Sequence, residues 1–404
     1  MKYNKSSVII AMVGLLSSKV CAMTYADFYE ELREKSSQIK VKKYELEAEI
    51  EKRNQADLYF LPKVRADVSK KRNMSGEEEE ATISASSTLY TTETSIRKDI
   101  ANDQVVLSRL GLMQEEEKLY RLMLENVISI KVYGELLKDA EYLKRQSIDL
   151  YEQIERNYQL GLAKSSDRNQ GKLLIERIQT DIESISREIA LFKANIELAT
   201  GVEYPEIDVT IDEERLAYIE TFEAKIENIK NNIEYQIVNI QSDIARKDIQ
   251  QQNPLFELKL FSEYKMRDGE ESDDSHIGIQ GGWNIFNYES RSNVKAKSSL
   301  YLAALEKADN KFKEMSAKLK TTIYTRNSNI EEMKNLNDQL KTTEKILNNQ
   351  QSEYEISQSS YYEMLNTRYD LFTTKKRISD KRINVFLNSI EMLQLNGALI
   401  NNEY

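Results

Sequence analysis

Apolar residues recur along four stretches of the chain at spacings that alternate between three and four. Such spacing keeps one narrow apolar seam on a helix and favours left-handed coiled-coil packing. The remaining positions are mostly Glu, Lys, Asn and Gln, which suit water. The sequence therefore predicts long, paired helices. The four seams are Leu136, Ala140, Leu143, Ser147, Leu150, Ile154; Ile175, Ile178, Ile182, Ile185, Ile189, Phe192, Ile196; Ile219, Phe222, Ile226, Ile229, Ile233, Ile237, Ile240, Ile244; and Ile383, Phe386, Ile390, Leu393.

The period of the apolar positions changes to two at two places, just after Pro62 and just after Pro254. Each place has two alternating runs separated by a polar, acidic stretch, which predicts the β-hairpins 61–90 and 255–286. One face of each strand is apolar and the other polar, a pattern typical of barrel strands with lipid outside and water inside. The alternating runs are Val64, Ala66, Val68; Ile83, Ala85, Ser87, Leu89; Phe256, Leu258, Leu260; and Ile277, Ile279, Gly281, Trp283, Ile285.

The whole pattern occurs twice, with corresponding residues 192 to 196 positions apart, such as Pro62 with Pro254 and Tyr158 with Tyr354. We therefore predict a first repeat at 23–201 and a second at 214–404, joined by a connecting segment at 202–213. Each repeat is expected to run helix, hairpin, long helix, tip turn, helix. The tip turns are placed at 158–167 and 354–363.

The two long helices, about 91–159 and 288–356, contain no proline and would each reach roughly 100 Å. Helices of that length fit no compact domain. Four strands from one chain also enclose no useful lumen, so several chains must contribute to a barrel. Three chains would supply twelve strands.

Composition narrows the function. The 404 residues include only 12 Gly and 3 Pro, which agrees with few turns and long helices. The net charge of −10 argues against a nucleic-acid partner, because binding phosphates needs a basic face. The chain has one histidine, His276, expected to be solvent-exposed, and one cysteine, Cys21. We therefore predict no enzymatic activity, no metal site and no cofactor.

The N-terminus is typical of a secretory signal peptide, predicted at 1–22. Lys2 and Lys5 precede the apolar run 8–16, and Val20-Cys21-Ala22 resembles a cleavage site. Cleavage after Ala22 would leave a mature chain without cysteine. The alternative is lipidation of Cys21, although Lys19 and Val20 stand where that signal has small residues.

Several short segments resemble the TolC family of outer-membrane efflux and secretion ducts. They are Ala56–Pro62, Tyr158–Asp167, Leu198–Gly201 and Trp283–Phe286, in the family's order. The resemblance covers essentially the whole mature chain. It implies a mostly α fold with membrane β: a homotrimer with a twelve-stranded outer-membrane β-barrel that continues into a periplasmic α-helical, coiled-coil tunnel.

The resemblance also implies where partners bind. The tip turns of the family contact a periplasmic adaptor. Leu160, Gly161, Leu162 and Ala163 match the first turn, while Ile356, Ser357 and Gln358 form the second. The second turn departs from the family pattern, because Ser357 stands in place of Gly and Ser359 in place of Arg.

A second set of residues matches positions at the narrow periplasmic aperture: Asp167, Tyr354, Glu363 and Asn366. In a trimer, Glu363 would form a ring of carboxylates that favours cations. The alternative is that Glu363 lies on a solvent-exposed helix face with no role in the aperture. Ser359 and Asn366 lack the family's charges, so the closing contact is reduced to a hydrogen bond between Tyr354 and a carboxylate. Trp283 either anchors at the membrane interface or simply packs.

The expected function is a passive conduit from periplasm to outside, in the outer membrane of a Gram-negative bacterium, with a large periplasmic part. The implied partners are two further copies, a periplasmic adaptor, an inner-membrane transporter of ABC, RND or MFS type, and outer-membrane lipid. Drug efflux and type I protein secretion both fit. The alternative is a soluble periplasmic coiled-coil structural or adaptor protein, which would not need four amphipathic strands.

Overall fold

The computed structural model describes residues 23–73, 76–205, 209–251, 256–267, 274–283, 287–355 and 361–400. The signal peptide with Cys21, as well as Pro254, Ile285 and the second tip-turn residues Ile356, Ser357 and Gln358, lie outside these ranges.

The described chain is mostly helical, with one sheet of four strands. Two helices are very long, with 66 residues in α3 and 68 in α7, so each spans roughly 100 Å. The helices are α1 (Tyr25–Lys35), α2 (Ser37–Asp57), α3 (Thr94–Gln159), α4 (Ser165–Thr200), α5 (Glu213–Thr221), the 3-10 helix η1 (Ile226–Asn231), α6 (Ile233–Gln251), α7 (Tyr288–Glu355) and α8 (Tyr361–Leu395). The strands are β1 (Lys63–Asn73), β2 (Gly76–Thr91), β3 (Phe256–Arg267) and β4 (Asp274–Trp283).

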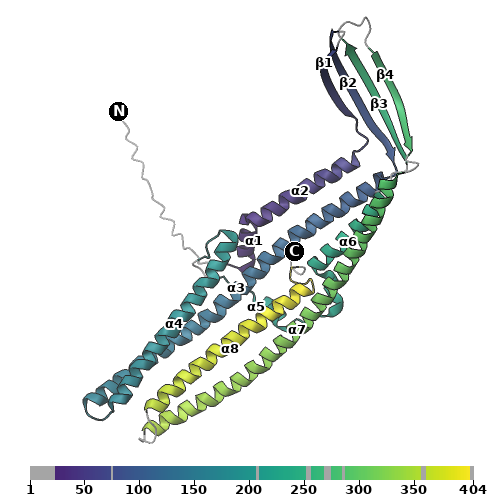
Figure 1. Cartoon of the computed structure of the whole chain (residues 1–404). Helices are drawn as coiled ribbons and strands as arrows, with labels where there is room; N and C mark the ends of the chain where they lie inside the picture. The colour runs from purple at the N-terminus through teal and green to yellow at the C-terminus, as the bar shows by residue number, and fades with distance from the viewer. Residues whose placement is uncertain are drawn as a thin grey trace, which may run out of the picture.

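The molecule is elongated, with the sheet at one end and the helical hairpins α3–α4 and α7–α8 pointing to the other end, which we call the tip (Figure 1). Near the sheet, α3 contacts α2 and α6, and α6 contacts α7. Toward the tip, α3 contacts α4 and α8, and α8 contacts α7. Near the sheet the helices therefore form one layer, with α2 along one edge and α7 along the other. Toward the tip α4 also contacts α8, so that α3, α4 and α8 pack together with α7 beyond α8. No helix in the described ranges is both long enough and apolar enough to cross a bilayer.

The sheet is antiparallel in the order β1-β2-β3-β4, and its register separates apolar from polar residues. Residues directly opposite each other on neighbouring strands share a face. One row, for example, joins Val64, Ala85, Ser262 and Ile277. The apolar face therefore holds Val64, Ala66, Val68, Ala81, Ile83, Ala85, Leu258, Leu260, Tyr264, Met266, Ile277 and Ile279, while the opposite face holds mainly charged, hydroxyl and amide side chains.

One position of the predicted alternation is wrong because β2 contains a β-bulge. The β2–β3 register shifts between Thr88 and Tyr90, so Tyr90, and not Leu89, lies opposite Leu258. An extra residue in one strand changes the phase of every position after it. Leu89 therefore does not continue the apolar row predicted for this strand.

Packing of the helical seams agrees with the sequence in the tip half of the molecule. All six predicted seam positions from Leu136 to Ile154 are buried, as are Ile178 and Ile185 facing them on α4. The neighbouring seam positions Ile175 and Ile182 are half-buried. One face of each helix thus closes against its neighbour, as a period of three and four requires.

The predicted continuous helical seam from Ile219 to Ile244 is wrong. The structure breaks it into α5, η1 and α6. Hydrogen bonds to the end of α8 explain the breaks, because residues between the three helices make them. Asn396 Oδ1 accepts from Lys225 N at 2.8 Å, and Asn232 Nδ2 donates to the Gln394 carbonyl at 2.8 Å. The first expected helix is similarly divided at Ser36, whose side chain caps α2.

Candidate functional site

The first tip turn is closed by backbone hydrogen bonds of the Schellman type. Gly161 N donates to the Tyr158 carbonyl at 3.0 Å, and Leu162 N donates to the Asn157 carbonyl at 2.7 Å. Gly161 has a φ of 76°, a left-handed conformation that favours glycine. The chain therefore reverses between α3 and α4 within five residues, Leu160 to Lys164.

The predicted adaptor-contact residues of this turn do not all point the same way. Leu160 is 72% exposed and Leu162 is 76% exposed, and Gly161 between them is exposed as well. Ala163 is half-buried and packs against the helical core of the tip. Two large apolar side chains thus project into solvent from a tightly hydrogen-bonded turn.

Arg168 holds the turn from the α4 side, a role that the sequence reasoning missed. Its Nε lies 2.8 Å from Glu155 Oε2, and its guanidinium lies 5.2 Å from the centre of the Tyr158 ring. The Tyr151 hydroxyl, followed by the charge of the Glu155 carboxylate, raises the pKa of Arg168 above its ordinary value. The available signal was the spacing: Glu155 and Tyr158 share one face of α3, and Arg168 follows in the first turn of α4.

The flanks of the second turn meet the first hairpin through aromatic residues. The rings of Tyr354, at the end of α7, and Tyr361, at the start of α8, lie 4.3 Å apart. Asn157 Nδ2 donates to the Tyr361 hydroxyl at 3.2 Å and so connects the two tip hairpins. Burial, followed by the neighbouring Tyr361 hydroxyl, raises the pKa of Tyr354 above its ordinary value.

The residues predicted for the aperture occupy separate places within one chain. Glu363 is exposed in the first turn of α8, and Asn366 follows one turn later, half-buried. Asp167 lies in the first turn of α4 and accepts from the Ser166 hydroxyl at 3.3 Å. Within the described part of the chain, no hydrogen bond joins Tyr354 to Asp167, since Tyr354 contacts Tyr361 instead.

At the other end of the molecule, an aromatic row crosses the helix-proximal end of the sheet. Trp283 is 71% exposed and its ring centre lies 4.8 Å from that of Phe256. Phe256 in turn lies 6.2 Å from Tyr90 on β2. Trp283 therefore both packs against a neighbouring strand and remains accessible.

His276 lies exposed on the polar face of the sheet, with Nε2 3.6 Å from Glu263 Oε2. Among the described residues, no group of three or more His, Cys, Asp or Glu side chains is arranged to hold a metal ion.

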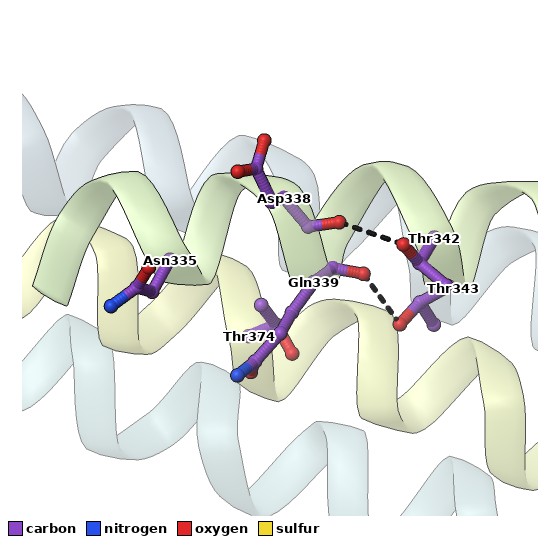
Figure 2. A pocket seen from close by; sticks show the side chains of 6 residues that line it. All are labelled: Asn335, Asp338, Gln339, Thr342, Thr343 and Thr374. Atoms are coloured by element: carbon purple, nitrogen blue, oxygen red, sulfur yellow. Dashed lines mark hydrogen bonds between the residues drawn. The ribbon is translucent and has the colours of Figure 1, made fainter.

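A depression between α7 and α8 is open to solvent and lined by polar side chains (Figure 2). The Thr342 and Thr343 hydroxyls donate to the carbonyls of Asp338 and Gln339, each at 2.9 Å. Asp338 is the one titratable residue among the six that line it: Asn335, Asp338, Gln339, Thr342, Thr343 and Thr374. With a single titratable group and hydroxyls bound to the helix backbone, this depression presents no acid–base pair.

Comparisons with known proteins identify the fold through structure alone. No protein-family model matches the chain, and no curated protein matches its sequence. Among solved structures, the channel protein CusC is 14% identical, with a TM-score of 0.78 over 92% of this chain and 91% of CusC. The outer-membrane protein VceC of Vibrio cholerae is 11% identical, with a TM-score of 0.76 over 92% of this chain and 95% of VceC.

The open-state structure of the MtrE outer-membrane channel of Neisseria gonorrhoeae is also similar. It is 11% identical, with a TM-score of 0.72 over 92% of this chain and 88% of MtrE. At these identities the likeness establishes the fold. All three are outer-membrane channels of the TolC family, which is the family that the four short segments resemble.

Proposed function

We propose that this chain, which has the fold of the TolC-family outer-membrane channels, is the outer-membrane subunit of a tripartite export system. The observation that carries the proposal is the sheet. Its four strands sort into one apolar and one polar face, and they stand at the end of helices roughly 100 Å long. A sheet with this division suits lipid on one side and water on the other.

Assembly into a ring follows from the two unlike edges of the molecule. In the described ranges, β1 and β4 each pair on one side only. The helical edges carry exposed apolar side chains, including Val41 and Tyr44 on α2 and Leu300 and Leu302 on α7. Because the edges differ, copies would join head to tail and close into a ring. Three copies would give twelve strands around a water-filled lumen.

In the proposed ring, the apolar face of the sheet contacts outer-membrane lipid. The aromatic row Tyr90, Phe256 and Trp283 lies at the helix-proximal end of that face. Aromatic side chains of this kind concentrate where membrane meets water. Trp283 is therefore proposed as an anchor at the periplasmic boundary of the outer membrane.

The tip is proposed to dock a periplasmic adaptor, which couples the duct to an inner-membrane transporter of ABC, RND or MFS type. Exposed Leu160 and Leu162 on a rigid turn support this, and Ile356, Ser357 and Gln358 are assigned to the same surface by the sequence. The transporter determines the cargo, so drug efflux and type I secretion both fit the duct. The chain itself acts as a passive conduit.

Crosslinking tests the adaptor proposal. Cys21 is the only native cysteine, so Gly161→Cys or Ser357→Cys carries a photoreactive thiol probe at a defined site. We expect either variant to capture one adaptor protein in cells. Lys172→Cys, exposed on α4 away from the turn, is the control. Equal capture from all three positions would contradict docking at the tip.

Glu363 is proposed to line the resting aperture, because it is exposed in the first turn of α8 next to the tip. A ring of three carboxylates would favour cations and bind multivalent ones. In single-channel recordings, Glu363→Ala should lower cation preference and weaken block by multivalent cations, whereas Glu152→Ala, on the exposed face of α3, should change neither. Unchanged selectivity in Glu363→Ala would contradict this role and place Glu363 on a solvent-exposed helix face away from the aperture.

The competing function is a soluble periplasmic coiled-coil structural or adaptor protein. It accounts for the helices but gives no reason for a sheet with one apolar, exposed face. Cell fractionation separates the two: the duct should sediment with outer membranes and need detergent for release. Recovery of the mature chain in the soluble periplasmic fraction would favour the competing function.

A further inference from the structure

A buried carboxyl group lies in the middle of the molecule, far from both the tip and the sheet. Glu117, on α3, is only 2% exposed. It faces Gln394, near the end of α8, and Glu234, in the first turn of α6. Three elements that are distant in the sequence therefore meet at this one acid.

The orientation of the Gln394 side chain is fixed by its neighbours. Arg121 Nη1 donates to Gln394 Oε1, and a guanidinium can only donate. Gln394 Nε2 therefore faces Glu117 and donates to Glu117 Oε2 at 3.1 Å. Among the described residues, this amide is the one hydrogen-bond donor to the buried carboxyl group.

The cations around the junction are already engaged with other acids. Arg121 Nε binds Glu125 at 2.7 Å. On α7, Lys311 binds Glu234 at 2.7 Å, and Lys318 binds Glu391 of α8, also at 2.7 Å.

We propose that Glu117 is a proton-sensitive contact: its neutral form holds the end of α8 against α3, and its ionised form weakens that junction. Ionised, the carboxylate would be buried with one neutral donor and would repel Glu234. Neutral, it can keep the Gln394 hydrogen bond without a buried charge.

The direction of the pKa shift agrees with this geometry. Burial, reinforced by the charge of Glu234, raises the pKa of Glu117 from 4.5 to about 7, while the Gln394 hydrogen bond and Arg121 oppose the rise. The folded state therefore binds the proton more tightly than the unfolded state. The stabilisation that the neutral carboxyl group gives to the folded state is complete below the unfolded-state pKa. It is lost as pH rises through the folded-state pKa of about 7.

The consequence for transport rests on the proposed function. Helix α8 runs from this junction to the tip, where Tyr361 contacts the first hairpin through Asn157. Weaker packing at one end of α8 changes how firmly its other end is held. In a duct, the conductance of the resting tip would then increase as periplasmic pH rises through neutrality.

Thermal unfolding of the detergent-extracted protein from about pH 5 to about pH 8.5 tests the contact without relying on transport. The wild type should lose about a hundredfold in its folding equilibrium across this range through Glu117, seen as a falling midpoint temperature. Glu117→Gln should remove that fall. Glu391→Gln, which removes a carboxylate paired with Lys318, should keep it.

Parallel pH profiles for wild type and Glu117→Gln would overturn the proposal. If Glu117→Gln does not fold, Gln394→Met gives a second test. Loss of the one donor to Glu117 should move the fall in midpoint temperature to higher pH, and an unmoved profile would also overturn the proposal. Conductance recordings of the reconstituted wild type at the same pH values form a separate arm. An absence of channels there would reject the duct and leave the thermal result standing.

Discussion

Gly397 shows how one backbone position fixes the middle of the molecule. It ends α8 with a φ of 64°, and its N–H donates to the Gln394 carbonyl at 2.9 Å. A Cβ at this position would collide with the backbone carbonyl of Asn231. Only glycine allows the end of α8 and the segment before α6 to approach this closely.

We expect Gly397→Ala to lower the free energy of unfolding by about 2 kcal/mol or more, since left-handed strain and a backbone collision act together. Chemical denaturation of the detergent-extracted protein measures it. Gly161→Ala is the matched control: it also has a positive φ but lies in open space, so it should cost about 1 kcal/mol. Equal losses would contradict the close approach at Asn231.

Arg168 gives a second prediction at this scale. Arg168→Gln removes the contacts to Glu155 and Tyr158, so the tip turn should open more often. Hydrogen exchange of the amides from 160 to 164 should speed up severalfold. Lys172→Gln, which removes an exposed ion pair with Glu176 on the same helix, should leave those amides unchanged. Unaltered exchange in Arg168→Gln would exclude Arg168 from positioning the turn.

Individual residues also show which contacts could be predicted from the sequence and which could not. Gly161 could be assigned to a helix end because a tight reversal needs a left-handed residue. Glu117 and Gln394 could not be paired, since 277 positions separate them and neither belongs to a recognisable pattern. Long-range polar contacts depend on packing, which local periodicity does not encode.

At the scale of elements, periodicity was reliable where helices pack only on helices. The seam from Leu136 to Ile154 is fully buried because it packs only against other helices, α4 and α8. The seam from Ile219 to Ile244 has the same spacing, yet it is broken where the chain packs against the C-terminal residues 392–399. There the capping side chains Asn232 and Asn396 determine the structure and the isoleucine spacing does not.

Asn232 therefore tests the reason for that break. Its Oδ1 accepts from Tyr235 N at 3.2 Å at the start of α6, while its Nδ2 binds the Gln394 carbonyl. Asn232→Ala should cost about 1 to 3 kcal/mol, because it removes a helix cap and a buried hydrogen bond. Asn228→Ala, at an exposed position of η1, should cost less than about 0.5 kcal/mol. A negligible effect of Asn232→Ala on denaturation would mean that another contact breaks the helix.

The sheet offers a prediction in which neighbouring residues serve as test and control. Ile279 lies on the apolar face of β4, and the next residue, Gln280, lies on the polar face. Ile279→Lys places a charge against lipid and should cost about 2 to 4 kcal/mol near the bilayer midplane. We expect less of this variant in the outer-membrane fraction, and wild-type amounts of Gln280→Lys. Equal amounts would mean that the apolar face does not contact lipid.

At the scale of the whole molecule, the sequence predicted the elongated form, because two proline-free stretches imply helices roughly 100 Å long. The strand pattern likewise indicated which residues share a face. The order of the helices within the layer, the bulge at Thr88–Tyr90 and the arrangement around Glu117 required the structure. These features arise from contacts between segments and not from the period of any one segment.

In the proposed function, copies of this chain close a water-filled channel through a lipid bilayer. Reconstitution of the detergent-extracted mature protein into planar bilayers, with single-channel recording, tests it most directly. We predict discrete, uniform conductance steps from an oligomer that resists separation in mild detergent. A chain that stays monomeric in plain buffer, shows no β-structure signal and never produces a conductance step would contradict the account.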